Sequence, residues 1–200
     1  MRRPGTEALT GRTEAPRRVD AVRNEERIIE AALTLLAADP QAAMDEIAHA
    51  AAVGRATLYR HFSTRDDLID VLRDRAGEDA AEAMRRSRLD DGPAAEALER
   101  LITEMVAVGD RYQFLVQIPD PPGARRRSDL AAQFVALIRR GQERGEFVRT
   151  VPADWWIELV RAALFCATRA VADGESRERA AAAAREVVLN GLRGGPSAGA

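Results

Sequence analysis

A short stretch of the chain places polar and cationic side chains at the spacing of a helical surface. Residues 44–62 read MDEIAHAAAVGRATLYRHF, and Arg55, Thr57, Tyr59 and Arg60 fall within about one and a half helical turns. An arginine can make a bidentate contact with O6 and N7 of guanine, and threonine and tyrosine hydroxyls can donate to phosphate oxygens. These residue types at this spacing indicate a surface that binds double-stranded DNA.

Such a surface needs two short helices joined by a tight turn, and the sequence over 43–62 predicts this helix-turn-helix. The expected helices cover residues 44–50 and 55–61. Ala48 is small enough for the second helix to cross the first closely. An apolar wedge lies between them: Ile47, Ala51, Val53 and Leu58. Residues 47–65 hold three arginines and two histidines without an acidic residue, in a chain with net charge −2. Counterion release from DNA would act at this locally positive stretch.

The remainder of the chain predicts helices and no strand. Apolar residues recur with helical spacing from Val22 until Asp39 and Pro40 end the pattern. Thr64 and Asp67 resemble a capping box at the start of a long helix. Further helices are expected over 94–117, 125–144, 153–172 and 175–192, separated by glycine and proline. The predicted fold is all-α: an N-terminal three-helix bundle with the helix-turn-helix, and a larger C-terminal helical domain.

The expected domain organisation has four parts. Residues 1–20 read as a disordered basic arm, either a plain tail or a segment that contacts phosphate. Residues 21–80 form the DNA-binding domain, residues 81–193 the helical domain, and residues 194–200 a flexible tail.

The composition argues against several classes of protein. All thirty basic residues are arginines, so lysine-dependent sites such as the P-loop and Schiff bases are absent. The chain has one cysteine, Cys166, and no HExxH or CxxC pattern, so we expect no disulfide, metal site, cofactor or catalytic residues. The longest uncharged run, residues 130–138, is about half of what a membrane span needs. We expect a non-enzymatic protein of the reducing cytoplasm.

The run from Arg27 to Leu72 resembles the N-terminal DNA-binding domain of the TetR family of regulators. The residues that carry the resemblance are Arg27-Ile-Ile-Glu-Ala-Ala32, Ile47-Ala48, Thr57-Leu-Tyr-Arg-His-Phe62, Arg65 and Leu68. The resemblance implies that Arg55 reaches base edges, that Phe62 packs the second helix onto the next one, and that the phosphate backbone is bound by Thr57, Tyr59, His61 and Arg65.

The turn departs from the pattern of the family. It reads Ala51-Ala52-Val53-Gly54, where the family usually has Ala-Gly-Val-Ser, and Ala43 stands where a phosphate-binding threonine is common. If Ala52 is left-handed, the alanine costs about 1–2 kcal/mol. Glycine in place of serine at the N-cap costs only a few tenths.

Family resemblance implies that the C-terminal domain binds a ligand and forms a homodimer through the last two helices. The stripe Trp156, Leu159, Val160, Ala163 and Ala167, with residues 180–184 and 187–189, could form that interface or cover the core of the domain itself. The larger apolar candidates for a pocket are Met84, Leu101, Met105, Tyr112, Phe114 and Phe134. We expect a small, largely apolar effector.

The function these features favour is a DNA-binding transcriptional regulator. Family resemblance favours a repressor that a small-molecule effector releases from a palindromic operator, over an activator. The alternative is a helical adaptor or scaffold with a degenerate helix-turn-helix that does not bind DNA.

Overall fold

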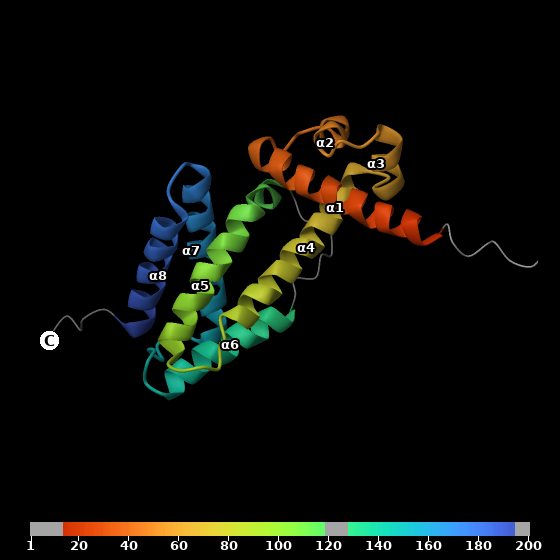
Figure 1. Ribbon diagram of the computed structural model, residues 1–200. Helices are drawn as coiled ribbons and strands as arrows, with labels where there is room; N and C mark the ends of the chain where they lie inside the picture. Colours follow the sequence, from red (N-terminus) through yellow and green to blue (C-terminus); the bar gives the residue numbers. More distant parts are fainter. Residues whose placement is uncertain (1–13, 119–127, 195–200) are drawn as a thin grey trace, which may run out of the picture. The chain divides into compact units, whose positions relative to one another are not determined.

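The computed structural model describes residues 14–118 and 128–194, and the regular elements in these ranges are all helical. Eight α-helices and one short 3-10 helix occur there, which confirms the predicted all-α fold (Figure 1). The chain divides into two compact units, one that ends at Leu72 and one that begins at Arg73.

The N-terminal unit contains a three-helix arrangement followed by the start of a fourth helix. α1 (Glu14–Ala38) packs against α2 (Met44–Ala50), and α2 packs against α3 (Arg55–His61). The first residues of α4 (Arg65–Arg86) complete the unit. Its fully enclosed side chains recur at helical spacing on each element: Ile28, Leu36, Ile47, Leu58, Leu68 and Leu72. Burial of this one face explains why such short helices are stable here.

A reciprocal capping box fixes the start of α4. The Thr64 amide donates to Asp67 Oδ2 at 2.9 Å, and the Asp67 amide donates to Thr64 Oγ1 at 3.1 Å. Both hydrogen bonds satisfy amides that have no partner within the helix. The predicted capping box is therefore confirmed, with aspartate in the role usually taken by glutamate.

The prediction of a disordered arm over residues 1–20 is wrong for its last seven residues, because α1 begins at Glu14. Pro16 falls in the first turn, where proline is tolerated because the first amides of a helix lack partners. Residues 1–13 lie outside the described residues.

In the C-terminal unit, helices pack around α5 (Ala94–Arg111). α5 contacts α6 (Ser128–Glu143), α7 (Ala153–Ala172) and α8 (Arg177–Arg193), and α7 packs along α8. The core includes Leu98, Leu101, Ile102, Val106, Phe134, Ile138, Trp156, Val160, Val188 and Leu192. α5 and α7 approach closely at Gly109, where a Cβ would lie 2.3 Å from Thr168 Oγ1.

Several boundaries differ from the sequence-based expectations. The N-terminal unit ends at Leu72 rather than at residue 80, so the boundary falls inside α4. The helix expected over 94–117 ends at Arg111, and a 3-10 helix, η1 (Gln113–Gln117), follows it. α6 begins at Ser128, and residues 125–127 of the helix expected over 125–144 lie outside the described residues. So do residues 195–200 of the expected tail.

Candidate functional site

The turn between α2 and α3 is built around a left-handed residue. Ala52 has a φ of 51°, and the Val53 amide donates to the Ala48 carbonyl oxygen at 3.0 Å. Gly54 then occupies the N-cap of α3 with extended backbone angles and no side-chain acceptor. The left-handed conformation considered for Ala52 is therefore present, and alanine carries a steric cost of about 1–2 kcal/mol there.

Arg27 on α1 holds this turn from outside the helix-turn-helix. Its Nη2 donates to the carbonyl oxygens of Ala51 at 2.5 Å and Ala52 at 2.8 Å. These carbonyls belong to the end of α2, where the last turn leaves acceptors without helical partners. The guanidinium thus caps α2 and ties the left-handed residue to α1. Sequence reasoning treats Arg27 only as the start of the family signature and contains no signal for this role.

The outer face of α3 carries the side chains that are free to approach DNA. Successive residues of a helix are rotated by about 100°, so Leu58, which is fully buried, marks the inner face. The exposed positions are Arg55, Ala56, Tyr59 and Arg60. Thr57 is half-buried beside them. Ala56 was not predicted as a site residue, although a small apolar side chain beside Arg55 can contact the methyl group of thymine.

Arg55 forms an ion pair with an acid of the preceding helix. Its Nη2 lies 2.8 Å from Oδ2 of Asp45, and its side chain is 74% exposed. An exposed pair of this kind stabilises the fold by about 0–1 kcal/mol, so its energetic value is small. The ion pair also orients Arg55, because a carboxylate that binds one edge of a guanidinium restricts the directions in which the remaining donors point. Asp45 is the second site residue that the sequence analysis missed.

His61 does not share this exposed face. Its side chain is 11% exposed, and Nδ1 lies 3.7 Å from Oε2 of Glu25 on α1. Nε2 is buried without a hydrogen-bond partner among the described residues. The placement argues against the phosphate contact that the resemblance implies for His61, because Nε2 is buried and Nδ1 faces a carboxylate.

Arg65 lies at the start of α4 and is half-buried. Its Nη2 donates to the carbonyl oxygen of Pro40 at 2.5 Å. This contact joins the first turn of α4 to the segment between α1 and α2. A guanidinium has five N–H donors, so the contact leaves capacity for a phosphate oxygen.

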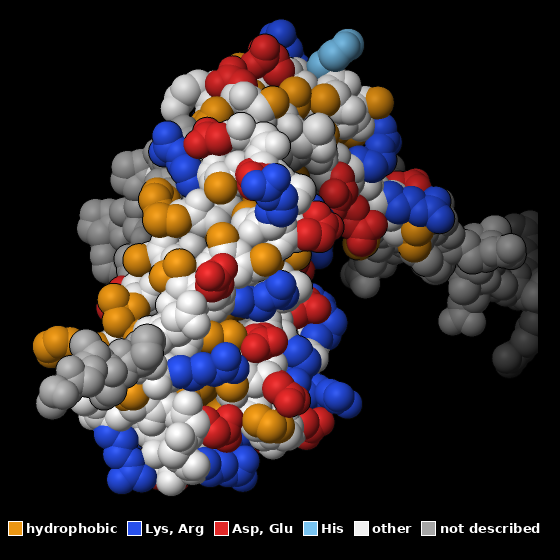
Figure 2. Space-filling view, turned by 90° about the vertical axis from the view of Figure 1, so that its left-hand side faces the viewer, with side chains coloured by type: hydrophobic (Ala, Val, Ile, Leu, Met, Phe, Trp, Pro, Cys, Tyr) orange, Lys and Arg blue, Asp and Glu red, His pale blue; other side chains and the backbone are white. Residues whose placement is uncertain are grey.

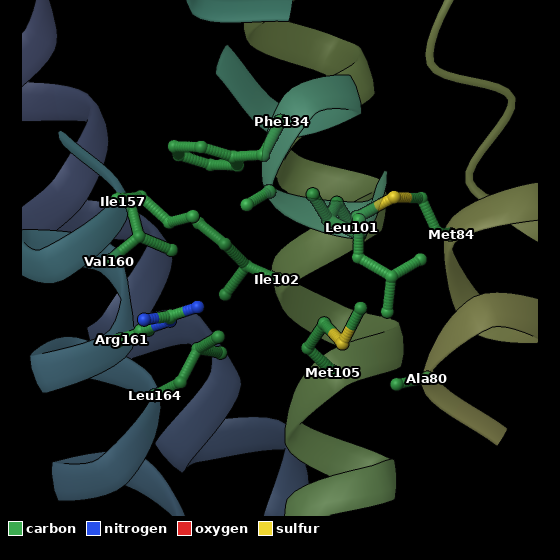
Figure 3. Close-up of a pocket in the computed structure, with 12 residues that line it drawn as sticks. Ala80, Met84, Leu101, Ile102, Met105, Phe134, Ile157, Val160, Arg161 and Leu164 are labelled. Atoms are coloured by element: carbon green, nitrogen blue, oxygen red, sulfur yellow. The ribbon is translucent and has the colours of Figure 1, made fainter. Parts of the chain in front are cut away.

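A separate cavity of about 220 Å³ lies inside the C-terminal unit (Figure 3). Helices α4 to α7 contribute its lining, and four of the six predicted pocket residues are present: Met84, Leu101, Met105 and Phe134. The other lining residues are Ala80, Ile102, Leu130, Ala131, Ile157, Val160, Arg161 and Leu164. Arg161, the one ionisable side chain in this lining, was not predicted.

Tyr112 and Phe114, the other two predicted pocket residues, are not among the lining residues of this cavity. Phe114 is fully buried. The Tyr112 hydroxyl donates to Oδ2 of Asp79 on α4 at 2.7 Å. Burial, followed by the hydrogen bond to Asp79 and its negative charge, raises the pKa of Tyr112 to about 12. Tyr112 therefore joins α5 to α4 rather than facing the cavity.

An apolar surface on α7 and α8 is exposed in this chain. Large hydrophobic side chains there include Trp155, Leu159, Phe165 and Val187, with exposed fractions of 46–69%. Figure 2 views the side on which α7 and α8 lie in Figure 1, and hydrophobic side chains are visible there among charged ones.

The stripe predicted for a dimer interface divides between the core of the unit and its exposed surface. Trp156, Val160 and Ala167 are buried in the core of the unit, as are Ala180 and Ala184 of α8. The alternative reading, in which these residues cover the domain's own core, is therefore correct for them. Leu159 and Val187, which belong to the same prediction, are exposed, and Trp155 lies one helical turn before Leu159 on the exposed side of α7.

Other kinds of site find little support. Among the residues described, no group of three or more histidine, cysteine or acidic side chains could hold a metal ion. Cys166 is exposed and not in a disulfide. No helix in the described ranges combines the length and the apolar character needed to cross a membrane.

Comparison with known proteins identifies relatives along most of the chain. The family model "Bacterial regulatory proteins, tetR family" matches residues 28–72. The transcriptional regulator NfxB of Pseudomonas aeruginosa is 33% identical over 167 residues, which cover 80% of this chain and 87% of NfxB. The transcriptional repressor LfrR of Mycolicibacterium smegmatis is 27% identical over 175 residues, or 85% of this chain and 90% of LfrR.

Solved structures agree with these matches. The crystal structure of the TetR-like regulator LfrR from Mycobacterium smegmatis in complex with proflavine has a TM-score of 0.70 and 26% identity, and the match covers 86% of this chain and 98% of that one. The match to NfxB over most of both chains and the family match at the helix-turn-helix lead to the same assignment. The chain belongs to the TetR family and is a DNA-binding transcriptional regulator.

Proposed function

We propose that this regulator is a homodimeric repressor, and that a small molecule bound in the cavity of the C-terminal unit releases it from a palindromic operator. The observation that carries the proposal is the outer face of α3, where Arg55, Tyr59 and Arg60 are exposed side by side on a helix that packs against α2. A degenerate helix-turn-helix in an adaptor would have no need of this polar face, and no feature of the chain favours that alternative.

DNA binding divides between base recognition and backbone contacts. Arg55 reads a base edge, with guanine as the preferred partner, because it stands at the N-terminus of the recognition helix and is exposed. Tyr59, Arg60, Thr57 and Arg65 bind phosphate oxygens around it. His61 is half-buried and faces Glu25 of α1, so it has a supporting role between α3 and α1.

The exposed apolar residues of α7 and α8 form the dimer interface. Trp155 and Leu159 lie four residues apart on α7, and Val187 on α8 is 69% exposed. Large apolar side chains exposed together on neighbouring helices are typical of protein–protein contacts. A symmetric dimer through this face presents two recognition helices, which require half-sites about 34–36 Å apart.

Release by an effector follows from the course of α4. This helix carries Leu68 and Leu72 in the core of the N-terminal unit, and Ala80 and Met84 at the cavity. A ligand that displaces the second pair therefore acts on the same helix that supports α3. The crystal structure of LfrR contains bound proflavine, and this supports a small-molecule effector for the present chain as well.

The test begins with selection of binding sites from random DNA by the purified protein. Selected sites should be pseudo-palindromes, and Arg55→Ala should cost about 1–3 kcal/mol of affinity and relax the preference at one base position in each half-site. Arg139→Ala on α6 is the matched control, since this arginine is also exposed. If Arg55→Ala leaves both affinity and preference unchanged, the assignment of α3 as the base-reading helix is wrong.

A further inference from the structure

We infer that the effector is an amphiphilic anion, an apolar body that carries a carboxylate or a similar group, and that Arg161 binds the charged end. The inference rests on the proposed function, because it concerns the ligand class of the same cavity. It goes further by giving that ligand a sign of charge and a binding partner.

The lining of the cavity gives the first reason. Of the twelve described residues that line the cavity, eleven are alanine, leucine, isoleucine, valine, methionine or phenylalanine, and Arg161 is the exception among them. These apolar walls offer a ligand dispersion contacts and burial, but no polar group that could orient it. Orientation must therefore come from the guanidinium. In Figure 3 the Arg161 side chain extends from α7 toward α5, the helix that carries Ile102.

The present partner of Arg161 is a weak competitor. Its Nη1 donates to Oε1 of Glu158 at 3.0 Å, one turn earlier on α7. Glu158 is 67% exposed and does not line the cavity. An exposed pair of this spacing contributes little to stability, and one carboxylate does not use all five donors of a guanidinium. A carboxylate that enters from the cavity side gains a charge-assisted contact without losing a strong one.

The same lining disfavours a cationic ligand. A cation seated among apolar walls next to a guanidinium loses its hydration and meets a like charge, and none of the described lining residues carries a carboxylate to offset it. A neutral apolar ligand would fill the cavity but would leave Arg161 paired with Glu158. The arrangement therefore selects by charge as well as by size. The volume of about 220 Å³ lies below the roughly 300–1,000 Å³ typical of sites for drug-sized ligands, so the ligand is small.

The experiment uses three matched series of probes: hexanoate, octanoate and decanoate, the amides of these acids, and the primary amines of the same chain lengths. Calorimetric titration of the full-length protein should show that carboxylates bind more tightly than amides, and amides more tightly than amines. Arg161→Met should weaken the carboxylates about tenfold to a hundredfold and leave the amides unchanged. Arg161→Lys keeps the charge but loses the planar fork, so its affinity for the carboxylates should lie between those of wild type and Arg161→Met.

Two further variants separate a binding role from a structural one. Glu158→Gln removes the competing carboxylate, so it should tighten carboxylate binding, a change that damage to the fold would not produce. Arg139→Met is the control for loss of an exposed arginine elsewhere in the unit. Equal binding of all three series, no binding by any of them, or a carboxylate preference that survives Arg161→Met would each overturn the inference.

A parallel measurement of DNA affinity distinguishes this inference from the proposed function. If octanoate binds in an Arg161-dependent manner but leaves DNA affinity unchanged, Arg161 is an anion site and the proposed release mechanism fails. If a ligand releases DNA equally well from wild type and Arg161→Met, the release mechanism holds and the role of Arg161 is wrong.

Discussion

Replacement of Ala52 by glycine should stabilise the N-terminal unit, against the general rule that glycine destabilises. Ala52 has a φ of 51°, a left-handed conformation that costs an alanine about 1–2 kcal/mol and costs glycine almost nothing. Glycine also gains freedom in the unfolded chain, which offsets roughly 0.5–1 kcal/mol of that relief. The net expectation is a gain of about 0.5–1 kcal/mol in the free energy of unfolding.

The hydrogen bonds around the turn are independent of this side chain. Arg27 donates to the carbonyl oxygens of Ala51 and Ala52, and a change to glycine retains both acceptors. DNA affinity should therefore stay within about twofold of wild type, because the position of α3 does not change. This separates a stability effect from a change in the binding surface.

The assay is urea unfolding of Ala52→Gly beside a control with glycine in an ordinary helical position. Ala37 is exposed near the end of α1 and serves this purpose. Ala37→Gly should lower the free energy of unfolding by up to about 1 kcal/mol, and with it the urea midpoint, whereas Ala52→Gly should raise both. If both variants lose stability, the strain at Ala52 is smaller than the entropy that glycine adds to the unfolded state, and the reasoning fails.

Three other predictions follow from contacts described above. Asp45→Asn should tighten binding to unrelated DNA by up to about fivefold and reduce discrimination between sites, because it removes a negative charge beside Arg55; anisotropy titrations on specific and random duplexes measure both. Because the pKa of Tyr112 is raised to about 12 from about 10 in the unfolded chain, its stabilising contribution is complete below pH 10 and is lost between pH 10 and 12. Between pH 9 and pH 11, the free energy of unfolding measured in urea should therefore fall by about 1–2 kcal/mol more for wild type than for Tyr112→Phe. An equal loss in both proteins would exclude this linkage. Leu159→Glu should convert the dimer into folded monomers in sedimentation experiments, and a dimer that persists would place the interface elsewhere.

The DNA-binding elements were predictable because their signals are local. The bounds of α2 and α3 match the expected residues 44–50 and 55–61. Caps, turn residues and a buried residue at each helical repeat all lie within a few positions of the helix ends they determine. The sequence raised the left-handed conformation of Ala52 only as a condition, because the family usually has glycine at this position of the turn. Contacts from outside the segment, such as that of Arg27, leave no comparable pattern.

The faces of α7 were not predictable for a physical reason. Trp155 and Trp156 stand side by side, as do Leu159 and Val160, so apolar residues occur on both the inner and the outer side of the helix. A periodicity argument finds a stripe in either register and cannot determine which one the core takes. The packing of α7 along α8 and α5 places Trp156 and Val160 inside.

Arg161 illustrates the limit for the cavity. It is one of thirty arginines, and no pattern in its neighbourhood distinguishes it from those on the surface. Its importance arises from the eleven apolar residues that four helices bring around it. Pocket residues chosen by size alone included Tyr112 and Phe114, because a large apolar side chain is equally suited to a core and to a cavity wall.

The cavity also sets a scale for how strongly a ligand can act on DNA binding. Unfilled space in a protein core costs about 24 cal/mol per Å³, so a cavity of about 220 Å³ corresponds to at most roughly 5 kcal/mol. A hundredfold preference for the arrangement that does not bind DNA requires only about 2.7 kcal/mol. A ligand that fills the cavity well in one arrangement of α4 and less than half as well in the other can therefore supply this preference, without dissociation of the dimer. Light scattering and a gel shift on the same ligand-saturated sample test this, since release of DNA that occurs only together with monomers would contradict it.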